Sequence, residues 1–224
     1  MDIILTKVLA YFVLLFSITI HEAAHGWAAK KLGDPTAFQL GRVTLNPIPH
    51  IDPVGTVMLP LIMMFTGIAL IGWAKPVPVN PMNLRNPRKD NLWISAAGPL
   101  SNFMAATGFV IILQMLKFLS PKLFQAAFYS VPGQASQLQF AQGLGLILYF
   151  GILINIALGI FNLIPIPPLD GSGVLMRFLS DEAAEKYDKI RPYGIFIIFG
   201  LIFFRFFQII FAPVQAFLQM LISM

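Results

Sequence analysis

Residues 7–31 of the chain read KVLAYFVLLFSITIHEAAHGWAAKK. Its first half carries no charge after Lys7, and about 20 apolar residues are enough for a helix to cross a bilayer. His21, Glu22 and His25 follow before two lysines end the stretch. Ionisable residues inside a membrane segment are costly and usually functional. We therefore expect a membrane helix here that carries a functional group of residues near one end.

The composition of the whole chain supports a membrane protein. Of its 224 residues, 57% are hydrophobic and 11% are charged, and the mean hydropathy is +0.77. Soluble domains are about a quarter charged. We expect a single membrane-embedded domain over 1–224 that is surrounded by a lipid bilayer. The net charge of +5 is spread thinly and gives no reason to expect a nucleic-acid partner. The absence of cysteine excludes disulfides and thiolate metal ligands.

Five apolar segments divide the chain. They lie at 7–29, 53–74, 91–116, 123–169 (with its helix expected at 143–163) and 192–224. Pro60 and Gly67 interrupt the second segment, which favours a re-entrant or broken segment over a full crossing. We predict an all-α polytopic membrane protein with about four transmembrane helices and a re-entrant or broken segment at 53–74.

The connections between these segments differ in character. Residues 34–52 and 75–90 mix β-forming residues with Pro and Asn, so we expect short β-like segments at the membrane surface. Residues 177–191 carry mixed charges and predict a short surface helix, and 119–140 predict a polar loop.

The distribution of basic residues favours one topology. If all five segments cross, lysines and arginines divide nine to five between the two sides. If 53–74 returns to its starting side, the division becomes eleven to three, and only Lys7, Lys117 and Lys122 remain outside. Since cytoplasmic loops carry an excess of Lys and Arg, the second arrangement is preferred.

The strongest chemical signal is His21-Glu22-Ala23-Ala24-His25 on the first predicted helix. Residues i and i+4 project from one face of a helix, about 6 Å apart along its axis. Two imidazoles at this spacing can bind one zinc ion, and the glutamate between them can act on a metal-bound water. We therefore predict a zinc site with Glu22 as the general base.

A catalytic zinc ion needs a third protein ligand. Asp170 follows three prolines that end the helix of the fourth segment, and it is the first candidate. His50 and Asp52, in the connection that follows the first segment, are the alternatives.

Three separated motifs resemble a known family. They are His21-Glu22-Ala-Ala-His25, Gly98-Pro99-Leu-Ser-Asn102 and Asn162-Leu-Ile-Pro-Ile-Pro-Pro-Leu-Asp170-Gly171. Together they resemble the site-2 proteases, zinc intramembrane metalloproteases of peptidase family M50, in a minimal form without PDZ or CBS modules. The resemblance implies that His21, His25 and Asp170 bind one Zn²⁺ per chain and that Glu22 activates water. It implies a peptidase that cleaves within or next to transmembrane helices of its protein substrates.

The proposed ligands and the topology support each other. Asp170 can meet the two histidines only if the fourth segment ends on their side, which requires 53–74 to return. We then expect the site toward the cytoplasmic side of the cell membrane of a prokaryote. Asn162 and Asn102 are candidates for contacts with substrate backbone or a developing oxyanion, and His50 for a supporting or substrate-contacting role. The alternative function is a non-proteolytic zinc transporter or scaffold.

Overall fold

The computed structural model describes residues 3–66, 72–129, 135–204 and 206–223. All regular secondary structure over these residues is helical, as predicted for the fold class. The elements in chain order are α1 (Ile3–Leu32), α2 (Thr36–Gln39), η1 (Ile48–His50), η2 (Pro53–Met58), α3 (Leu59–Thr66), η3 (Pro81–Asn83), α4 (Pro87–Leu119), α5 (Pro121–Phe128), α6 (Ala135–Asn162), α7 (Asp170–Met176), α8 (Asp181–Asp188), η4 (Arg191–Tyr193), α9 (Gly194–Phe203) and α10 (Phe206–Ser223).

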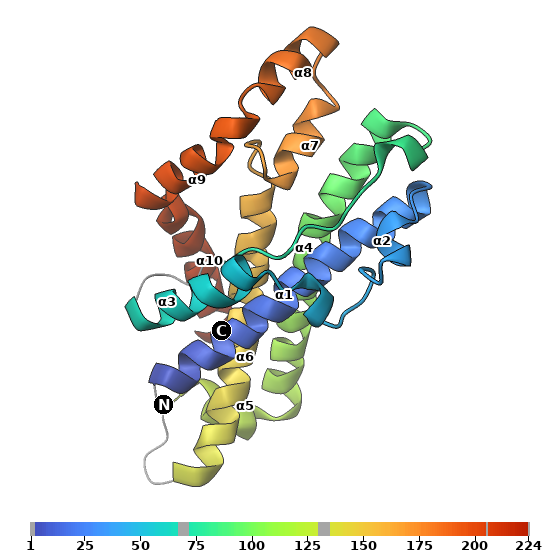
Figure 1. Cartoon of the computed structure of the whole chain (residues 1–224). Coiled ribbons are helices and arrows are strands. Elements are labelled where there is room, and N and C mark those ends of the chain that lie inside the picture. Colours follow the sequence, from blue (N-terminus) through green and yellow to red (C-terminus); the bar gives the residue numbers. More distant parts are fainter. Residues whose placement is uncertain (1–2, 67–71, 130–134, 205, 224) are drawn as a thin grey trace.

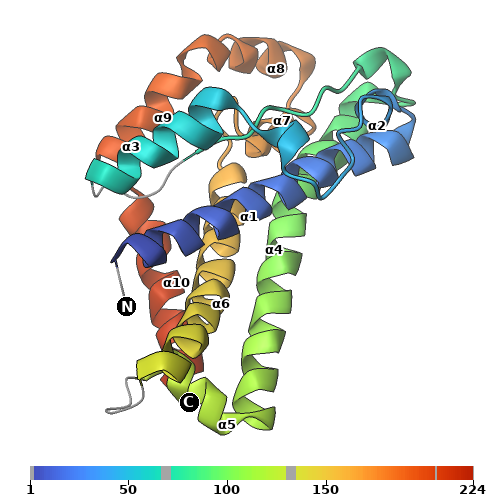
Figure 2. The same ribbon diagram turned by 60° about the horizontal axis from the view of Figure 1, so that its bottom comes forward.

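Three helices form the frame of the molecule. Helix α1, helix α4 and residues Phe140–Asn162 of α6 are each long and apolar enough to cross a membrane. Helices α4 and α6 lie side by side and run in opposite directions, and α1 crosses them obliquely (Figures 1 and 2). These helices confirm three of the predicted spans, although α6 begins at Ala135, well before the expected start at 143.

The fourth expected span is divided. Arg205 and Pro213 interrupt this apolar segment in the sequence, and its described residues, 192–204 and 206–223, form η4, α9 and α10; α9 ends at Phe203, whereas Pro213 lies inside α10. Arg205, whose role the sequence leaves open, lies outside the described residues. Within the part of the chain that the structure describes, three helices reach spanning length and shorter apolar helices accompany them, so the predicted count of about four transmembrane helices is confirmed in part.

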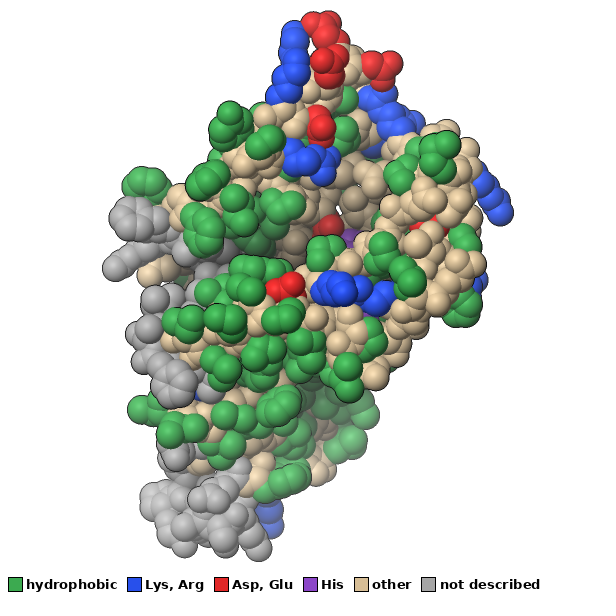
Figure 3. Space-filling model, viewed as in Figure 1, with side chains coloured by type: hydrophobic (Ala, Val, Ile, Leu, Met, Phe, Trp, Pro, Cys, Tyr) green, Lys and Arg blue, Asp and Glu red, His purple; other side chains and the backbone are tan. Residues whose placement is uncertain are grey.

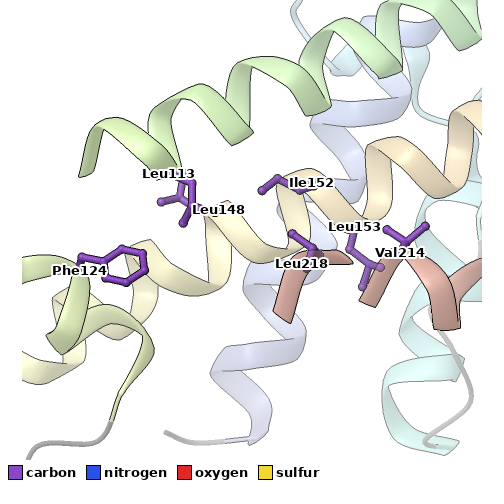
Figure 4. Packing of buried hydrophobic residues seen from close by; sticks show 7 residues of the cluster. All are labelled: Leu113, Phe124, Leu148, Ile152, Leu153, Val214 and Leu218. Carbon is purple, nitrogen blue, oxygen red and sulfur yellow. The ribbon is translucent and has the colours of Figure 1, made fainter. Parts of the chain in front are cut away.

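Close packing joins the frame at the end away from the histidines. Leu113 of α4, Phe124 of α5, three residues of α6 and two of α10 form one buried cluster (Figure 4). Farther along the same interface, rings of α4 lie against glycines of α6: Phe109 on Gly151 and Phe103 on Gly159, where a Cβ would lie 2.7 Å from the ring. Small residues allow such close approach between membrane helices.

The predicted β-like segments are wrong for the described residues. Residues 34–52 form α2, η1 and the turns between them. Residues 75–80 are extended but form no strand. Pro76 and Pro78 have no backbone N–H, so they cannot complete a ladder of hydrogen bonds. Side chains bind this segment instead.

The expected polar loop at 119–140 is also largely helical. Ser120 is followed by Pro121, which is favoured at the first position of a helix, and α5 begins there. Residues 130–134 lie outside the described part of the chain. The predicted surface helix within 177–191 is confirmed as α8, whose Ser180 side chain accepts a hydrogen bond from Ala183 N.

The apolar segment 53–74 doubles back on itself. The Thr56 hydroxyl donates to Trp73 O at 2.8 Å, and Trp73 N donates to Gly55 O at 3.2 Å. The two ends of the segment therefore lie together. This geometry agrees with a segment that returns to the side from which it entered.

Polar contacts join the loops that lie at one end of the three long helices, the end opposite to Lys117. Asp34, just after α1, accepts hydrogen bonds from Asn80 N and the Asn83 amide, and Arg88 at the start of α4 pairs with Asp181 of α8. Charged side chains gather at this end in Figure 3, whereas the surface below is mostly hydrophobic. At the other end, Lys117 Nζ donates to Leu221 O and Ile222 O.

This arrangement predicts which loops share one side of a membrane. Single cysteines in place of Lys31, Lys89 and Lys186 should react with a membrane-impermeant thiol reagent from the same side, and one in place of Lys122 from the other. All four side chains are exposed and the chain has no cysteine of its own. If Lys89→Cys and Lys186→Cys reacted from the side opposite to Lys31→Cys, segment 53–74 would cross the membrane fully.

Candidate metal centre

The two histidines of α1 lie where this helix crosses α4. His21 and His25 are 7% and 8% exposed, and their rings meet edge to face with centroids 4.7 Å apart. Gly98 of α4 faces them. A Cβ on Gly98 would lie 2.4 Å from His25 Nε2 and 2.6 Å from His21 Nε2. The absent side chain of Gly98 therefore leaves the space in which these two nitrogens converge.

The loop after α6 brings Asp170 to the same place. Pro165, Pro167 and Pro168 prevent α6 from continuing beyond Asn162, and Asp170 is the first residue of α7. Asp170 Oδ2 lies 3.0 Å from His21 Nε2, and Oδ1 lies 3.3 Å from His25 Nε2. In Figure 3 a histidine side chain is visible at the bottom of a recess beside the region of α1.

Hydrogen bonds to the other ring nitrogens determine how the two imidazoles are protonated. His25 Nδ1 lies 2.7 Å from Ile94 O, and His21 Nδ1 lies 2.7 Å from Asn102 Oδ1. Carbonyl oxygens only accept hydrogen bonds, so each Nδ1 carries a proton and, in the neutral imidazole, each Nε2 presents a lone pair. Such partners are typical of metal-binding histidines, whose orientation they hold.

The donor set fits a zinc ion. Two nitrogen lone pairs and a carboxylate face one another within 4.8 Å, and the buried Oδ2 of Asp170 has no hydrogen-bond partner among the described residues. Acceptors that face one another repel unless a cation lies between them. Two imidazoles and one carboxylate are a common zinc ligand set, which leaves a fourth position open.

Glu22 is held beside this cluster by the extended segment 75–80. Its Oε2 accepts a hydrogen bond from Val77 N at 3.0 Å. The segment is itself clamped at two points: the buried guanidinium of Arg42 donates to Lys75 O and Pro76 O, and Asp34 Oδ2 accepts from Asn80 N at 2.7 Å. The carboxylate of Glu22 therefore has a defined position next to the two histidines.

Asp34 is a stable anchor for this clamp. Burial would raise the pKa of its carboxyl group, but hydrogen bonds from Asn83, Thr36 and Asn80 outweigh burial and hold the pKa below its usual value. The charged form of Asp34, which accepts these hydrogen bonds, is therefore favoured.

The alternative ligands lie outside the cluster. Asp52 Oδ1 accepts from Val54 N and Gly55 N and so caps η2. His50 is fully buried, its Nε2 donates to Thr44 O, and burial lowers the pKa of its imidazole. Of the three candidates for a third ligand, the structure brings Asp170 alone to the histidines among the described residues.

The two asparagines proposed to contact substrate differ in environment. Asn102 is fully buried and its amide is engaged on both sides, by His21 at its oxygen and by Ser17 O and Asn155 at its nitrogen. Asn162 at the end of α6 donates to Leu158 O of its own helix. The structure thus joins Asn102 to a histidine and not to an open surface.

Sequence reasoning missed several residues of the site. Nothing in the spacing of Val77 indicated a bond to Glu22, since it forms through a backbone N–H. Gly98 stood within a motif without an assigned role. Ser17 and Asn155 did carry a signal, because each is a polar residue in an otherwise apolar run.

Comparison with known proteins identifies the family. The family model described as Peptidase family M50 matches residues 9–207, which include both histidines, Glu22 and Asp170. The chain belongs to peptidase family M50. No solved structure matches it.

Relatives of this M50 protease come from several organisms. It is 36% identical over 191 residues to YwhC of Bacillus subtilis, a match that covers 85% of this chain and 77% of that protein. It is 30% identical over 190 residues to Rip2 of Mycolicibacterium smegmatis (84% and 64%), and 28% identical over 181 residues to MJ0392 of Methanocaldococcus jannaschii (80% and 36%). All three carry the words zinc metalloprotease in their names. This M50 protein is accordingly a zinc metalloprotease with a His, His, Asp candidate metal site.

The space left by Gly98 generates a testable prediction. Gly98→Ala should lower the zinc content of the purified protein from about one ion per chain to well below it, because the new methyl group would occupy the place of convergence. The matched control is Gly108→Ala on the same helix, where a Cβ would meet nothing within 4 Å. This control should retain zinc and gain up to about 1 kcal/mol of helix stability. Metal analysis checks both, and full zinc in Gly98→Ala would contradict the geometry.

Proposed function

We propose that this M50 protease is a zinc-dependent intramembrane endopeptidase, which hydrolyses peptide bonds within or next to transmembrane helices of membrane proteins. The main support for this proposal is the position of the metal site within the uncharged part of helix α4, below its charged end. Gly98 follows Asp90, the last charged residue at the start of α4, by about 12 Å along the helix axis. The next 26 residues of α4, 91–116, carry no charge. The histidines that face Gly98 therefore lie below the level of the charged helix end.

The residues around the site have distinct tasks. His21, His25 and Asp170 would hold one Zn²⁺ per chain, which when bound supplies Lewis-acid activation of water and of a peptide carbonyl. Glu22 accepts a proton from the attacking water and returns it to the leaving amine. The Val77 N–H holds the Glu22 carboxylate in position for both transfers.

The substrate must reach the site in an extended form. A peptide bond inside a transmembrane helix is shielded by the hydrogen bonds of its own backbone. Of the two connections with the composition of β-like segments, 34–52 is folded into helices and turns, whereas 75–80 in the other is extended and passes beside Glu22. Pairing of an extended peptide with a protein segment is a recurrent mode of peptide binding. We propose that substrate lies along 75–80, at backbone groups that Arg42, Glu22 and Asp34 leave unoccupied.

The membrane side follows from the distribution of charge. With segment 53–74 returning, eleven basic residues lie at the end that holds the metal site and three at the other. We propose that the site faces the cytoplasmic side. The relatives named above are from prokaryotes, which supports the cell membrane of a prokaryote as the location.

Three substitutions test the role of the general base separately from the role of the metal ligands. Glu22→Gln should retain about one zinc ion per chain and lose at least about 100-fold in cleavage of a single-pass membrane substrate, because it removes the base and no ligand. Asp170→Asn should weaken zinc binding, since an amide is a poorer ligand than a carboxylate. His21→Ala should lose the metal.

These variants are compared with Glu185→Gln on the exposed surface of α8, which should keep both zinc and activity. Metal analysis and a cleavage assay in the same vesicles provide the measurements. Cleavage by Glu22→Gln at the wild-type rate would exclude the mechanism, and full zinc in His21→Ala would exclude the site.

A further inference from the structure

Three helices contribute to one buried polar network next to the metal site. Ser17 of α1, Asn102 of α4 and Asn155 of α6 are all 0% exposed. A polar group in an apolar interior is costly unless it is hydrogen-bonded. The Asn155 side chain forms hydrogen bonds with both Asn102 and Ser17, and Asn102 connects the network to His21.

Backbone carbonyls determine the orientation of both amides. Asn102 Nδ2 lies 3.1 Å from Ser17 O, and Asn155 Nδ2 lies 2.7 Å from Gly151 O. A backbone carbonyl cannot donate, so the group facing it must be the NH₂ of the amide. The oxygen of Asn155 therefore faces Asn102, and the oxygen of Asn102 faces His21.

The hydrogen bonds consequently all run in one direction. His21 Nδ1 donates to Asn102 Oδ1, Asn102 Nδ2 donates to Asn155 Oδ1 at 2.8 Å, and Asn155 Nδ2 donates to the Ser17 hydroxyl at 2.9 Å. The Ser17 hydroxyl donates in turn to Val13 O at 2.7 Å. Every donor has an acceptor, and reversal of one amide would set donor against donor.

We propose that Asn155 and Ser17 are positioning residues for the metal site. Together with the backbone carbonyl of Ser17, they hold the oxygen of Asn102 toward His21, which keeps the proton on Nδ1 and directs the lone pair of Nε2 into the space between His21 and Asp170. If Asn102 turned over, its NH₂ would face Nδ1, the proton would move to Nε2, and Nε2 would no longer bind a metal. This inference rests on the proposed zinc site. His25 needs no such positioning residues, because its Nδ1 donates to the backbone carbonyl of Ile94, which cannot turn over as an amide side chain can.

Zinc affinity, measured by competition with a chelator on the purified protein, tests the proposal. Asn155→Leu is similar in size but cannot form hydrogen bonds, and it should weaken zinc binding by about 10- to 100-fold. Ser17→Ala should weaken it less. The matched control is Thr19→Val: Thr19 is also fully buried on α1 and donates to Leu15 O, but it does not join the network. This control should bind zinc as the wild type does.

Asn155→Leu is also measured in a second variant, to distinguish a role of Asn155 in orienting Asn102 from a role in helix packing. In Asn102→Asp, either carboxylate oxygen can accept the hydrogen bond from His21 Nδ1, so turning the side chain over does not place a donor against this nitrogen. Adding Asn155→Leu to this background should therefore cause little further loss of zinc affinity, whereas it causes a large loss when Asn102 is present. A role of Asn155 in packing alone would give the same loss in both backgrounds.

The outcomes are distinguishable. Wild-type affinity in both Asn155→Leu and Ser17→Ala, or an equal loss in the two backgrounds, would overturn the proposal. If Asn155→Leu failed to fold, which thermal unfolding of the zinc-free protein would show, Ser17→Ala against Thr19→Val would decide the question alone. Failure of the wild type to bind zinc, or full binding by His21→Ala, would instead reject the proposed function.

Discussion

The close approach of α1 to α4 at Gly98 is the contact on which the rest of the structure depends. Without a side chain at this position, the imidazoles of His21 and His25 reach into the helix crossing, and their Nδ1 atoms meet Asn102 and Ile94 on the same helix. The direction of α4 then determines where α6 runs, since the rings of Phe103 and Phe109 lie against glycines of α6. The end of α6 in turn places the proline-rich loop that presents Asp170. A change in the crossing would therefore move all three ligands.

Hydrogen bonds between elements distant in sequence give this membrane protein much of its specificity. Apolar side chains pack equally well against lipid and against other helices, so burial of apolar area does little to select one arrangement. Hydrogen-bonded polar pairs do favour one arrangement of the helices, because each donor requires an acceptor at a particular position. Asn102 with Asn155, Arg42 with the carbonyls of 75 and 76, and Asp34 with Asn80 each join segments that are far apart along the chain. The first of these pairs continues to His21, and the other two hold the segment whose Val77 N binds Glu22.

The parts of the fold that sequence predicted are those governed by composition and short spacing. Long apolar runs located the three helices of spanning length among about four that were predicted, and the i, i+4 histidines predicted two members of the cluster that the structure brings together with Asp170. The errors arose where backbone groups bond to side chains. Residues 75–80 have the composition of a strand, yet prolines and contacts with Glu22, Arg42 and Asp34 replace a ladder. The start of α6 was missed because hydropathy does not locate helix ends within a long apolar stretch, whereas the charge of Arg205 did mark the division between α9 and α10.

The order of the ligands along the chain has a consequence for biosynthesis. His21 and His25 are made with the first membrane helix, but Asp170 emerges only after α4 and α6, since it follows both in the sequence. During this interval the nascent α1 carries His21, Glu22 and His25 before Asp170 has been synthesised. The order of synthesis therefore delays the metal centre, because no arrangement of the helices made before Asp170 can complete it. The cell is exposed to the cutting activity only once the membrane bundle that confines it has been built.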